Sequence, residues 1–210
     1  MPDTQEITPK TPVEIMKKIL HFYPLPSLTL LTFSSLKKGS EEEQTAWIKH
    51  FLQGQLTCDL DEVSEGQSRW FAHCNLQGRM ISLGRLVQIK DSYFLILPKN
   101  IAQTAQQHLE KYAAFSRISI EEKANFQCFG LNSETPIENY PTTQNTVLTQ
   151  DPLTLISLGE QRWLGLSREI PNLSDEFDLI PHDETEWLTQ EIQHLSPFLT
   201  PETVGEISPA

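Results

Sequence analysis

The sequence predicts an α+β protein in which helices lie on a mainly antiparallel sheet. Two observations predict this class: the segments run in the order strand, helix, three strands, helix and strand, and the consecutive strands are joined by tight turns. The chain has 210 residues, of which 38% are hydrophobic. That length can bury a sizeable core, either in one large domain or in two small lobes.

The first half of the chain carries the clearest local signals. Residues 1–26 begin polar and rich in proline, and we expect them to form a flexible arm. Residues 27–33 are apolar and predict a strand. Ser40 is followed three residues later by Glu43, a capping-box pattern, and an apolar helical face then runs to Gly54, a residue typical of a helix C-cap. We therefore predict a helix between Ser40 and Gly54.

The middle of the chain predicts a meander of strands and a second helix. A turn at 76–78 separates two strand-like segments, and a second turn at 90–92 leads into a third. A single apolar stripe at helical spacing follows. The predicted elements are strands 68–75, 79–89 and 93–97, a helix over 100–115, and short strands at 117–120 and 126–130.

The second half is less regular. Residues 132–152 are polar and contain three prolines, which predicts a long exposed connection. Residues 153–158 and 162–166 predict a hairpin that turns at Gly159 and Glu160, and residues 184–194 predict a short helix.

Charge and composition exclude several classes of protein. With 16 Lys and Arg against 28 Asp and Glu, the formal net charge is −12, and no basic run occurs, which disfavours direct binding to nucleic acid or anionic lipid. The apolar stretch at 27–33 is far shorter than the roughly 20 residues of a spanning helix. We find no secretory signal, and the three cysteines form no Cys-x-x-Cys pair. These features favour a cytoplasmic protein with free thiols.

Short catalytic and metal-binding motifs are missing from the sequence. It contains no Gly-x-Gly, no Gly-x-Ser-x-Gly and no His-Glu-x-x-His. The segment 59–61 begins like a calcium loop, but Val63 stands where a ligand is needed. His73 and Cys74 are neighbours on a predicted strand and point to opposite faces, so they cannot easily bind one ion. We expect no metal.

Three blocks resemble a known family in their order and spacing. They read Phe-Leu-Gln-Gly-Gln-Leu-Thr-Cys-Asp at 51–59, Ala-His-Cys-Asn-Leu-Gln-Gly-Arg-Met at 72–80 and Leu-Glu-Lys-Tyr-Ala-Ala-Phe-Ser at 109–116. They resemble the YgfZ family, part of the folate-binding superfamily of the glycine-cleavage aminomethyltransferase (T-protein). The similarity covers about 28–130 and resumes more faintly at 187–197.

The resemblance implies two ferredoxin-like lobes of mainly antiparallel sheet, with helices on one face, around a central folate pocket. We accordingly expect a first lobe at 27–120, an abridged second lobe at 121–198 and a tail at 199–210. The sequence ends before the family signature Lys-Gly-Cys-Tyr-x-Gly-Gln-Glu. We therefore expect a shortened version that lacks the family's C-terminal β-barrel.

The resemblance also implies a set of site residues. Trp187 corresponds to a family tryptophan that lines the folate pocket, where an indole face can stack on a pterin or aminobenzoyl ring; the alternative is a core tryptophan that anchors the last helix. A guanidinium could bind an anionic tail, or lie solvated on its strand. Amides and imidazole could bind the heteroaromatic edge, although the amides at 53 and 55 could equally just flank a helix end. The expected folate-binding residues are Trp187, Gln53, Gln55, His73, Asn75, Arg79 and Arg85.

Departures from the family pattern bear on catalysis. The aminomethyltransferase has a catalytic Asp pair where this chain has Ser82 and Leu83. Leucine cannot accept a proton, so we expect no catalytic residue. A second pocket tryptophan has no counterpart near Leu36, and Gln193 and Leu195 replace a usual Glu and Gly.

The leading hypothesis is a non-catalytic accessory protein that binds tetrahydrofolate or a related folate. Family membership implies support of iron–sulfur cluster enzymes and of tRNA modification, with those enzymes as partners and without direct contact to nucleic acid or membrane. The first alternative is a folate-dependent aminomethyl or one-carbon transferase. The second is a protein-interaction module that has lost the folate pocket.

Overall fold

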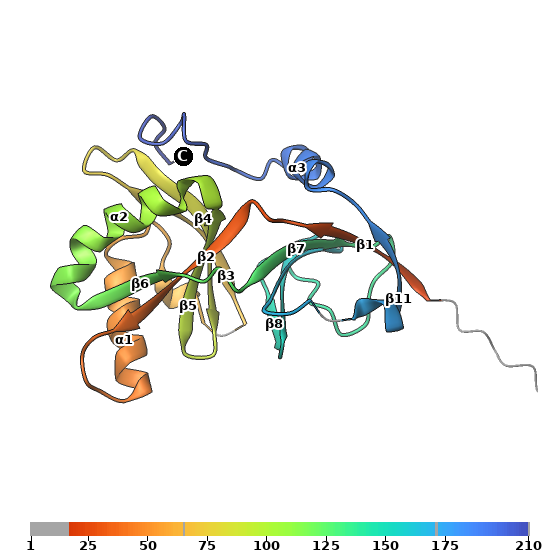
Figure 1. Cartoon of the computed structure of the whole chain (residues 1–210), viewed down its shortest axis with the longest axis horizontal. Coiled ribbons are helices and arrows are strands. Elements are labelled where there is room, and N and C mark those ends of the chain that lie inside the picture. Colours follow the sequence, from red (N-terminus) through yellow and green to blue (C-terminus); the bar gives the residue numbers. More distant parts are fainter. Residues whose placement is uncertain (1–16, 65, 171, 210) are drawn as a thin grey trace, which may run out of the picture.

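Two mainly antiparallel sheets and three helices make up the structure, a computed structural model that describes residues 17–64, 66–170 and 172–209. Figure 1 shows the two sheets side by side, with the segment after the last helix running back over the first sheet. The predicted α+β class is confirmed. Among the described residues, no helix has both the length and the apolar character needed to cross a membrane.

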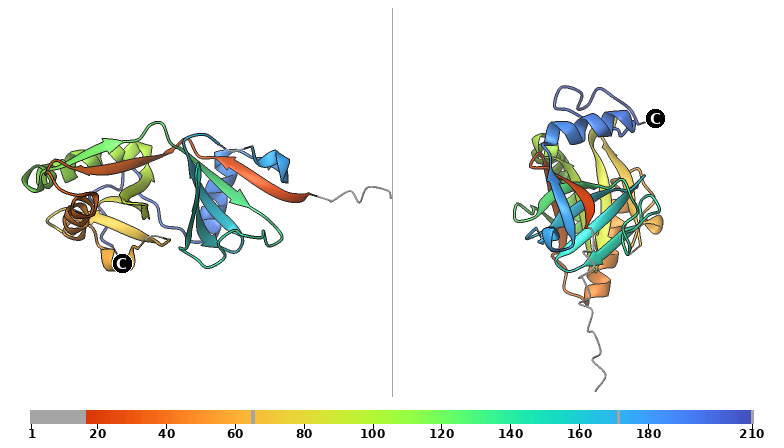
Figure 2. Two further views of the ribbon diagram at one scale, coloured as in Figure 1. Left: turned by 90° about the horizontal axis from the view of Figure 1, so that it is seen from below. Right: turned by 90° about the vertical axis from the view of Figure 1, so that its right-hand side faces the viewer.

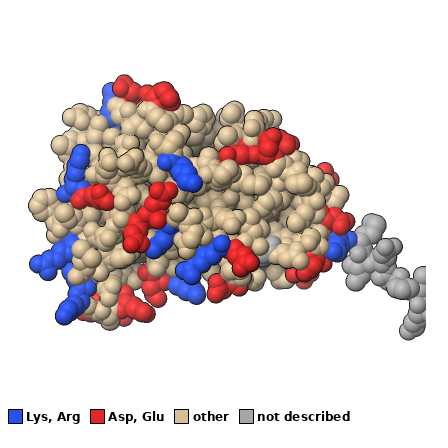
Figure 3. Space-filling view, in the orientation of Figure 1, with Lys and Arg blue, Asp and Glu red and all other residues tan. Residues whose placement is uncertain are grey.

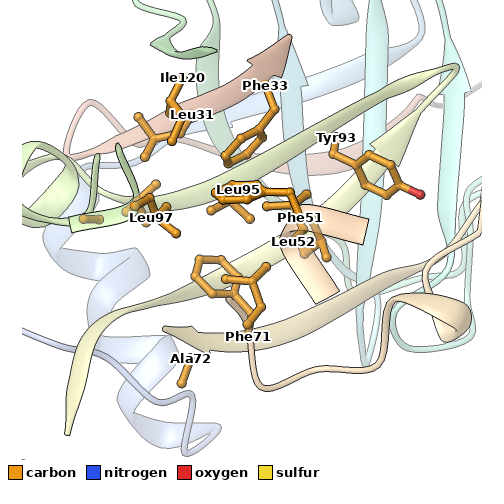
Figure 4. Packing of buried hydrophobic residues seen from close by; sticks show 14 of the residues in the cluster. Leu31, Phe33, Phe51, Leu52, Phe71, Ala72, Tyr93, Leu95, Leu97 and Ile120 are labelled. Atoms are coloured by element: carbon orange, nitrogen blue, oxygen red, sulfur yellow. The ribbon is translucent and has the colours of Figure 1, made fainter. Parts of the chain in front are cut away.

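The first lobe is a five-stranded sheet with the order β3-β4-β5-β2-β6. Two helices cover one of its faces, and Figure 4 shows the apolar side chains that fill the space between helices and sheet. The strands are β2 (Leu28–Ser35), β3 (Ser68–Cys74), β4 (Met80–Ile89), β5 (Ser92–Pro98) and β6 (Ile118–Glu122), and the helices are α1 (Glu41–Gln53) and α2 (Lys99–Ser116).

The second lobe is a six-stranded sheet with the order β11-β1-β7-β10-β9-β8. Its outer face has an apolar core of its own that includes Phe129 and Trp163. The strands are β1 (Lys18–Pro24), β7 (Gln127–Asn132), β8 (Val147–Gln150), β9 (Leu153–Gly159), β10 (Arg162–Ser167) and β11 (Phe177–Pro181). Helix α3 (Glu184–Gln193) follows β11 and contacts β1.

The two lobes meet through a shared apolar core. Successive residues of a strand point to opposite faces, so Leu95 and Leu97 of β5 pack under the helices while Phe94 and Ile96 face the other lobe. From the second lobe, Leu164 lies in the same shared core. Both faces of the first sheet are therefore covered, and the left view in Figure 2 shows the two lobes next to each other along the long axis of the molecule.

The local signals of the first helix behave as predicted. The Ser40 side chain accepts a hydrogen bond from the Glu43 backbone N–H (3.2 Å), and the Glu43 carboxylate accepts one from the Ser40 N–H (2.8 Å), which completes the capping box. Gly54 is the C-cap. The predicted hairpins and the helices over 100–115 and 184–194 are also present.

Two sequence expectations need correction, and the expected tail makes a contact that was not foreseen. Residues 18–24 are no arm: β1 pairs in parallel with β11 and antiparallel with β7; the rest of the expected arm, up to residue 16, lies outside the described residues. The polar stretch 132–152 contains β8, which pairs with β9. The tail packs on the first lobe, where Leu199 is buried in the core. The pairing of β1 with β11 and β7 joins segments distant in sequence, which local patterns do not reveal, whereas β8 and β9 form a local hairpin inside a stretch whose polar composition hid it.

Candidate functional site

A cavity of about 630 Å³ lies between the two lobes. Its volume falls within the range of small-molecule sites, and its walls are mostly apolar, as in such sites. Strands β4 and β5 form one wall, β9 and β10 another, and α3 with the segment after it closes a third side. The apolar lining includes Leu25, Leu28, Leu83, Ile96, Leu97, Leu158, Leu164, Leu188, Ile192 and Phe198.

Trp187 is one wall of this cavity. A capping box between Asp183 and Glu186 starts α3, and Trp187 is the buried residue of that helix, with 3% of its surface exposed. Its ring lies directly on Gly130, which has no side chain to hold it off, and the Arg162 guanidinium lies 4.8 Å from the ring centroid. The structure thus places the expected tryptophan in the cavity wall and holds it firmly there.

A second indole, Trp70, lies on the wall formed by the first lobe and was missed in the sequence. Trp70 of β3 pairs across the sheet with Arg85 of β4, and the Arg85 guanidinium lies 4.4 Å from the Trp70 ring centroid. Both side chains line the cavity. Burial lowers the pKa of Arg85 to about 10; the negative charge of Glu191 raises this pKa and the positive charge of Arg162 lowers it. The Arg85 side chain therefore stays charged at neutral pH.

A smaller, polar chamber of about 310 Å³ adjoins the large cavity and shares Trp70 and Arg85 with it. Arg162, with 3% exposure, also lines this chamber, and its guanidinium forms an ion pair of 2.5 Å with Glu191. Arg162 and Glu191 were not singled out in the sequence, since nothing local marks two residues on different elements as partners.

The two positions at which the sequence resemblance implies a catalytic acid pair carry uncharged side chains. Leu83 lines the large cavity, and Ser82 is fully buried, with no hydrogen-bond partner for its hydroxyl among the residues that the structure describes. Two carboxylates do reach the cavity. Glu184 accepts hydrogen bonds from the Ser27 backbone N–H (3.1 Å) and hydroxyl (2.5 Å), and Glu191 is paired as described. Both are therefore engaged in structural contacts.

The amide candidates do not reach the cavity. The Gln53 side-chain oxygen accepts a hydrogen bond from the Leu60 N–H (2.7 Å) and orders the loop after α1. The Asn75 side chain accepts hydrogen bonds from the N–H groups of Gln77 and Arg79 and so shapes the β3–β4 turn. Gln55 follows α1 and is likewise absent from the lining.

Arg79 and His73 also lie elsewhere. Arg79 is exposed and donates to the Glu206 carbonyl (3.1 Å). His73 is 1% exposed, and its Nε2 lies 3.0 Å from Nδ1 of His108 on α2. Burial, with a smaller contribution from His108, lowers the pKa of His73 to about 4. Of the seven expected residues, the structure brings only Trp187 and Arg85 to the cavity.

The described residues contain no group of three or more His, Cys, Asp or Glu side chains that could hold a metal ion. The three cysteines are free, and burial raises the pKa of Cys58 to about 11 and of Cys128 to about 12. These two thiols are therefore poor nucleophiles at neutral pH.

Comparison with known proteins agrees with this fold and with the resemblance of the three sequence blocks. No family model matches the chain. The structure is similar to the glycine cleavage system aminomethyltransferase T of Bartonella henselae, with a TM-score of 0.58 and 13% identity, over 79% of this chain and 48% of that protein. The fold is therefore that of the aminomethyltransferase (T-protein) class.

Sequence relatives narrow this class. The chain is 29% identical over 117 residues to the tRNA-modifying protein YgfZ of Vibrio atlanticus, which covers 55% of this chain and 36% of that protein. It is 31% identical over 170 residues to an uncharacterised protein of Haemophilus influenzae, over 80% of this chain and 54% of the relative. The chain is thus YgfZ-like, and it spans about half, or less, of the length of these two relatives.

Proposed function

We propose that the chain binds a reduced folate in the cavity between its lobes and acts as a non-catalytic accessory protein in tRNA modification. The observation that carries the proposal is the cavity itself: about 630 Å³, mainly apolar, with Trp70 and Trp187 in its lining. The half-buried indole of Trp70 leaves ring surface on which a flat heteroaromatic ring can stack, whereas the nearly fully buried Trp187 contributes to the wall, and the volume suits a ligand of that size. The relatives' name, tRNA-modifying protein, supports the cellular role.

The absence of catalysis is part of the proposal, and Leu83 supports it. An apolar residue lines the cavity at the position that carries a catalytic acid in the aminomethyltransferase, and it can neither accept nor donate a proton. For the transferase alternative, we expect no folate-dependent release of product when the chain is incubated with an aminomethyl donor. If the wild-type chain forms product and variants at Trp70 and Trp187 do not, the result would favour that alternative.

We infer that the role in tRNA modification is indirect and runs through iron–sulfur enzymes of a reducing cytoplasm. The distribution of charge on the surface supports this. Figure 3 shows acidic and basic side chains interspersed on the face in view, without a continuous basic stripe. Direct binding to tRNA normally requires such a stripe. We expect no complex with tRNA in a gel-shift assay at physiological salt, while a folate-competent chain restores tRNA modification in cells that lack a relative.

Folate binding is tested by titrating folinic acid while following tryptophan fluorescence. Trp70→Phe and Trp187→Phe should each weaken the saturable quenching, because both indoles line the cavity. Trp47→Phe is the matched control, since Trp47 lies on α1 and is absent from the lining. A wild-type chain that shows no saturable response at millimolar ligand would contradict the proposal and favour an interaction module without a pocket.

A further inference from the structure

Two buried arginines face the smaller chamber from opposite lobes. Arg85 belongs to β4 and is 6% exposed, and Arg162 belongs to β10 and is 3% exposed. Both line the polar chamber of about 310 Å³. Burying a cation is costly unless an anion or several acceptors compensate it, so such a pair calls for negative charge.

Among the described residues, only Arg162 of these two cations forms a direct ion pair with a carboxylate. Glu191 forms its 2.5 Å ion pair with Arg162, and no described residue accepts a hydrogen bond from the Arg162 Nε atom. Arg85 donates to the Asn145 side-chain oxygen (2.8 Å), and within residues 17–64, 66–170 and 172–209 it forms no ion pair. Most of its five N–H donors thus remain for another partner.

The other acid at this chamber does not supply that partner. Glu160 has 79% of its side chain exposed and is paired with His194 Nε2 at 3.0 Å. It therefore lies at the rim, in water, where its charge is strongly screened. The buried part of the chamber keeps a net positive charge.

We propose that this chamber is an anion-binding subsite in which Arg85 holds a carboxylate at the acidic end of the ligand. The inference rests on the proposed function, because it takes the ligand's ring system to lie in the large cavity. Arg85 and Trp70 line both spaces, so one ligand can place its aromatic part in the first and its acid in the second. The ligand class is then a heteroaromatic compound with a carboxylate tail, such as a pteroylglutamate.

The test compares folic acid with its glutamyl diamide, which has nearly the same size but no carboxylate charge. The wild-type chain should bind folic acid about tenfold or more tightly than the diamide, the effect of one charge-assisted hydrogen bond. Arg85→Gln should reduce this preference to about one. Arg79→Gln, at an exposed arginine outside the chamber, should keep the full preference.

Competition with inorganic phosphate tests whether the carboxylate of the bound ligand occupies the chamber. Phosphate should compete with folic acid and leave the diamide unaffected, because only the acid occupies the chamber. Equal affinity of the wild type for folic acid and diamide would overturn the subsite while leaving the proposed function intact. Absence of saturable binding by both compounds would instead overturn the proposed function. The wild-type comparison decides the question even if Arg85→Gln fails to fold.

Discussion

Replacing Gly130 by alanine should move the indole wall of the cavity. A Cβ atom at this position would lie 2.3 Å from Cε3 and 2.4 Å from Cζ3 of Trp187. Carbon atoms in van der Waals contact are about 3.5–4.0 Å apart, so the ring must shift by more than about 1 Å. Trp187 is almost fully buried and lines the cavity, so its ring can shift only by disturbing its packing or by moving into the cavity. Such overpacking costs about 1–3 kcal/mol.

The assay combines thermal unfolding with the folinic acid titration. For a chain of this size, each kcal/mol lowers Tm by roughly 2–4 °C, so Gly130→Ala should lower it by roughly 2–12 °C. Gly165→Ala is the matched control. A Cβ there would lie 2.2 Å from Cε2 of Phe129, which belongs to the outer core of the same sheet. Gly165→Ala should also lose stability, while only Gly130→Ala should shift Trp187 and weaken ligand binding.

An unchanged Tm and unchanged fluorescence in Gly130→Ala would refute the packing of Trp187 on Gly130. Equal loss of binding in both glycine variants would show that binding follows overall stability and not the position of the indole.

Three further changes have defined outcomes in urea unfolding. Burial lowers the pKa of His73 from 6.5 to about 4, so the unfolded chain binds this proton at a higher pH than the folded chain does. Up to about 3 kcal/mol of folding stability is therefore lost as the pH falls from 7 to 4. His73→Gln should remove that loss. Glu191→Ala leaves buried Arg162 without its partner and should cost about 3 kcal/mol, whereas Asp61→Ala breaks an exposed pair and should cost less than about 1 kcal/mol. Leu195 has a φ of 54° and is 88% exposed, so Leu195→Gly should raise the free energy of unfolding by about 1 kcal/mol.

Each of these outcomes has a clear contrary result. The same acid sensitivity in wild type and His73→Gln would show that the imidazole is protonated in the folded state. Equal costs for the two acidic variants would mean that burial of the ion pair has no energetic consequence. A loss of stability in Leu195→Gly would show that its side chain packs on a neighbour.

Local sequence signals were sufficient for the elements that depend on neighbours in the chain. The capping box at Ser40 and Glu43 needs only residues three apart, and the hairpins need only turn residues between apolar segments. The resemblance to the YgfZ family also led to Trp187. In this chain Leu195 stands where the resemblance implies a glycine. The structure agrees with that comparison, because Leu195 adopts the left-handed backbone conformation that glycine adopts most easily.

The rest of the site depends on register and on contacts between lobes. A bulge between His73 and Cys74 shifts the β3–β4 pairing by one residue. Counting outward from the turn would have paired Trp70 with Gly84, whereas the folded sheet places it opposite Arg85. Long-range pairing likewise decides β1, which joins β11 from the other end of the chain.

By itself, then, the sequence determined the type and order of most elements, because their stabilising contacts are local. Only the tertiary structure decided which side chains line the two cavities. Trp70 and Arg85 are paired by the register of β3 and β4, and Arg162 and Glu191 by the contact of β10 with α3; the two pairs face each other only when the lobes bury their common core. The free energy that brings them together comes from removing apolar surface from water, a driving force that depends on area and not on sequence distance.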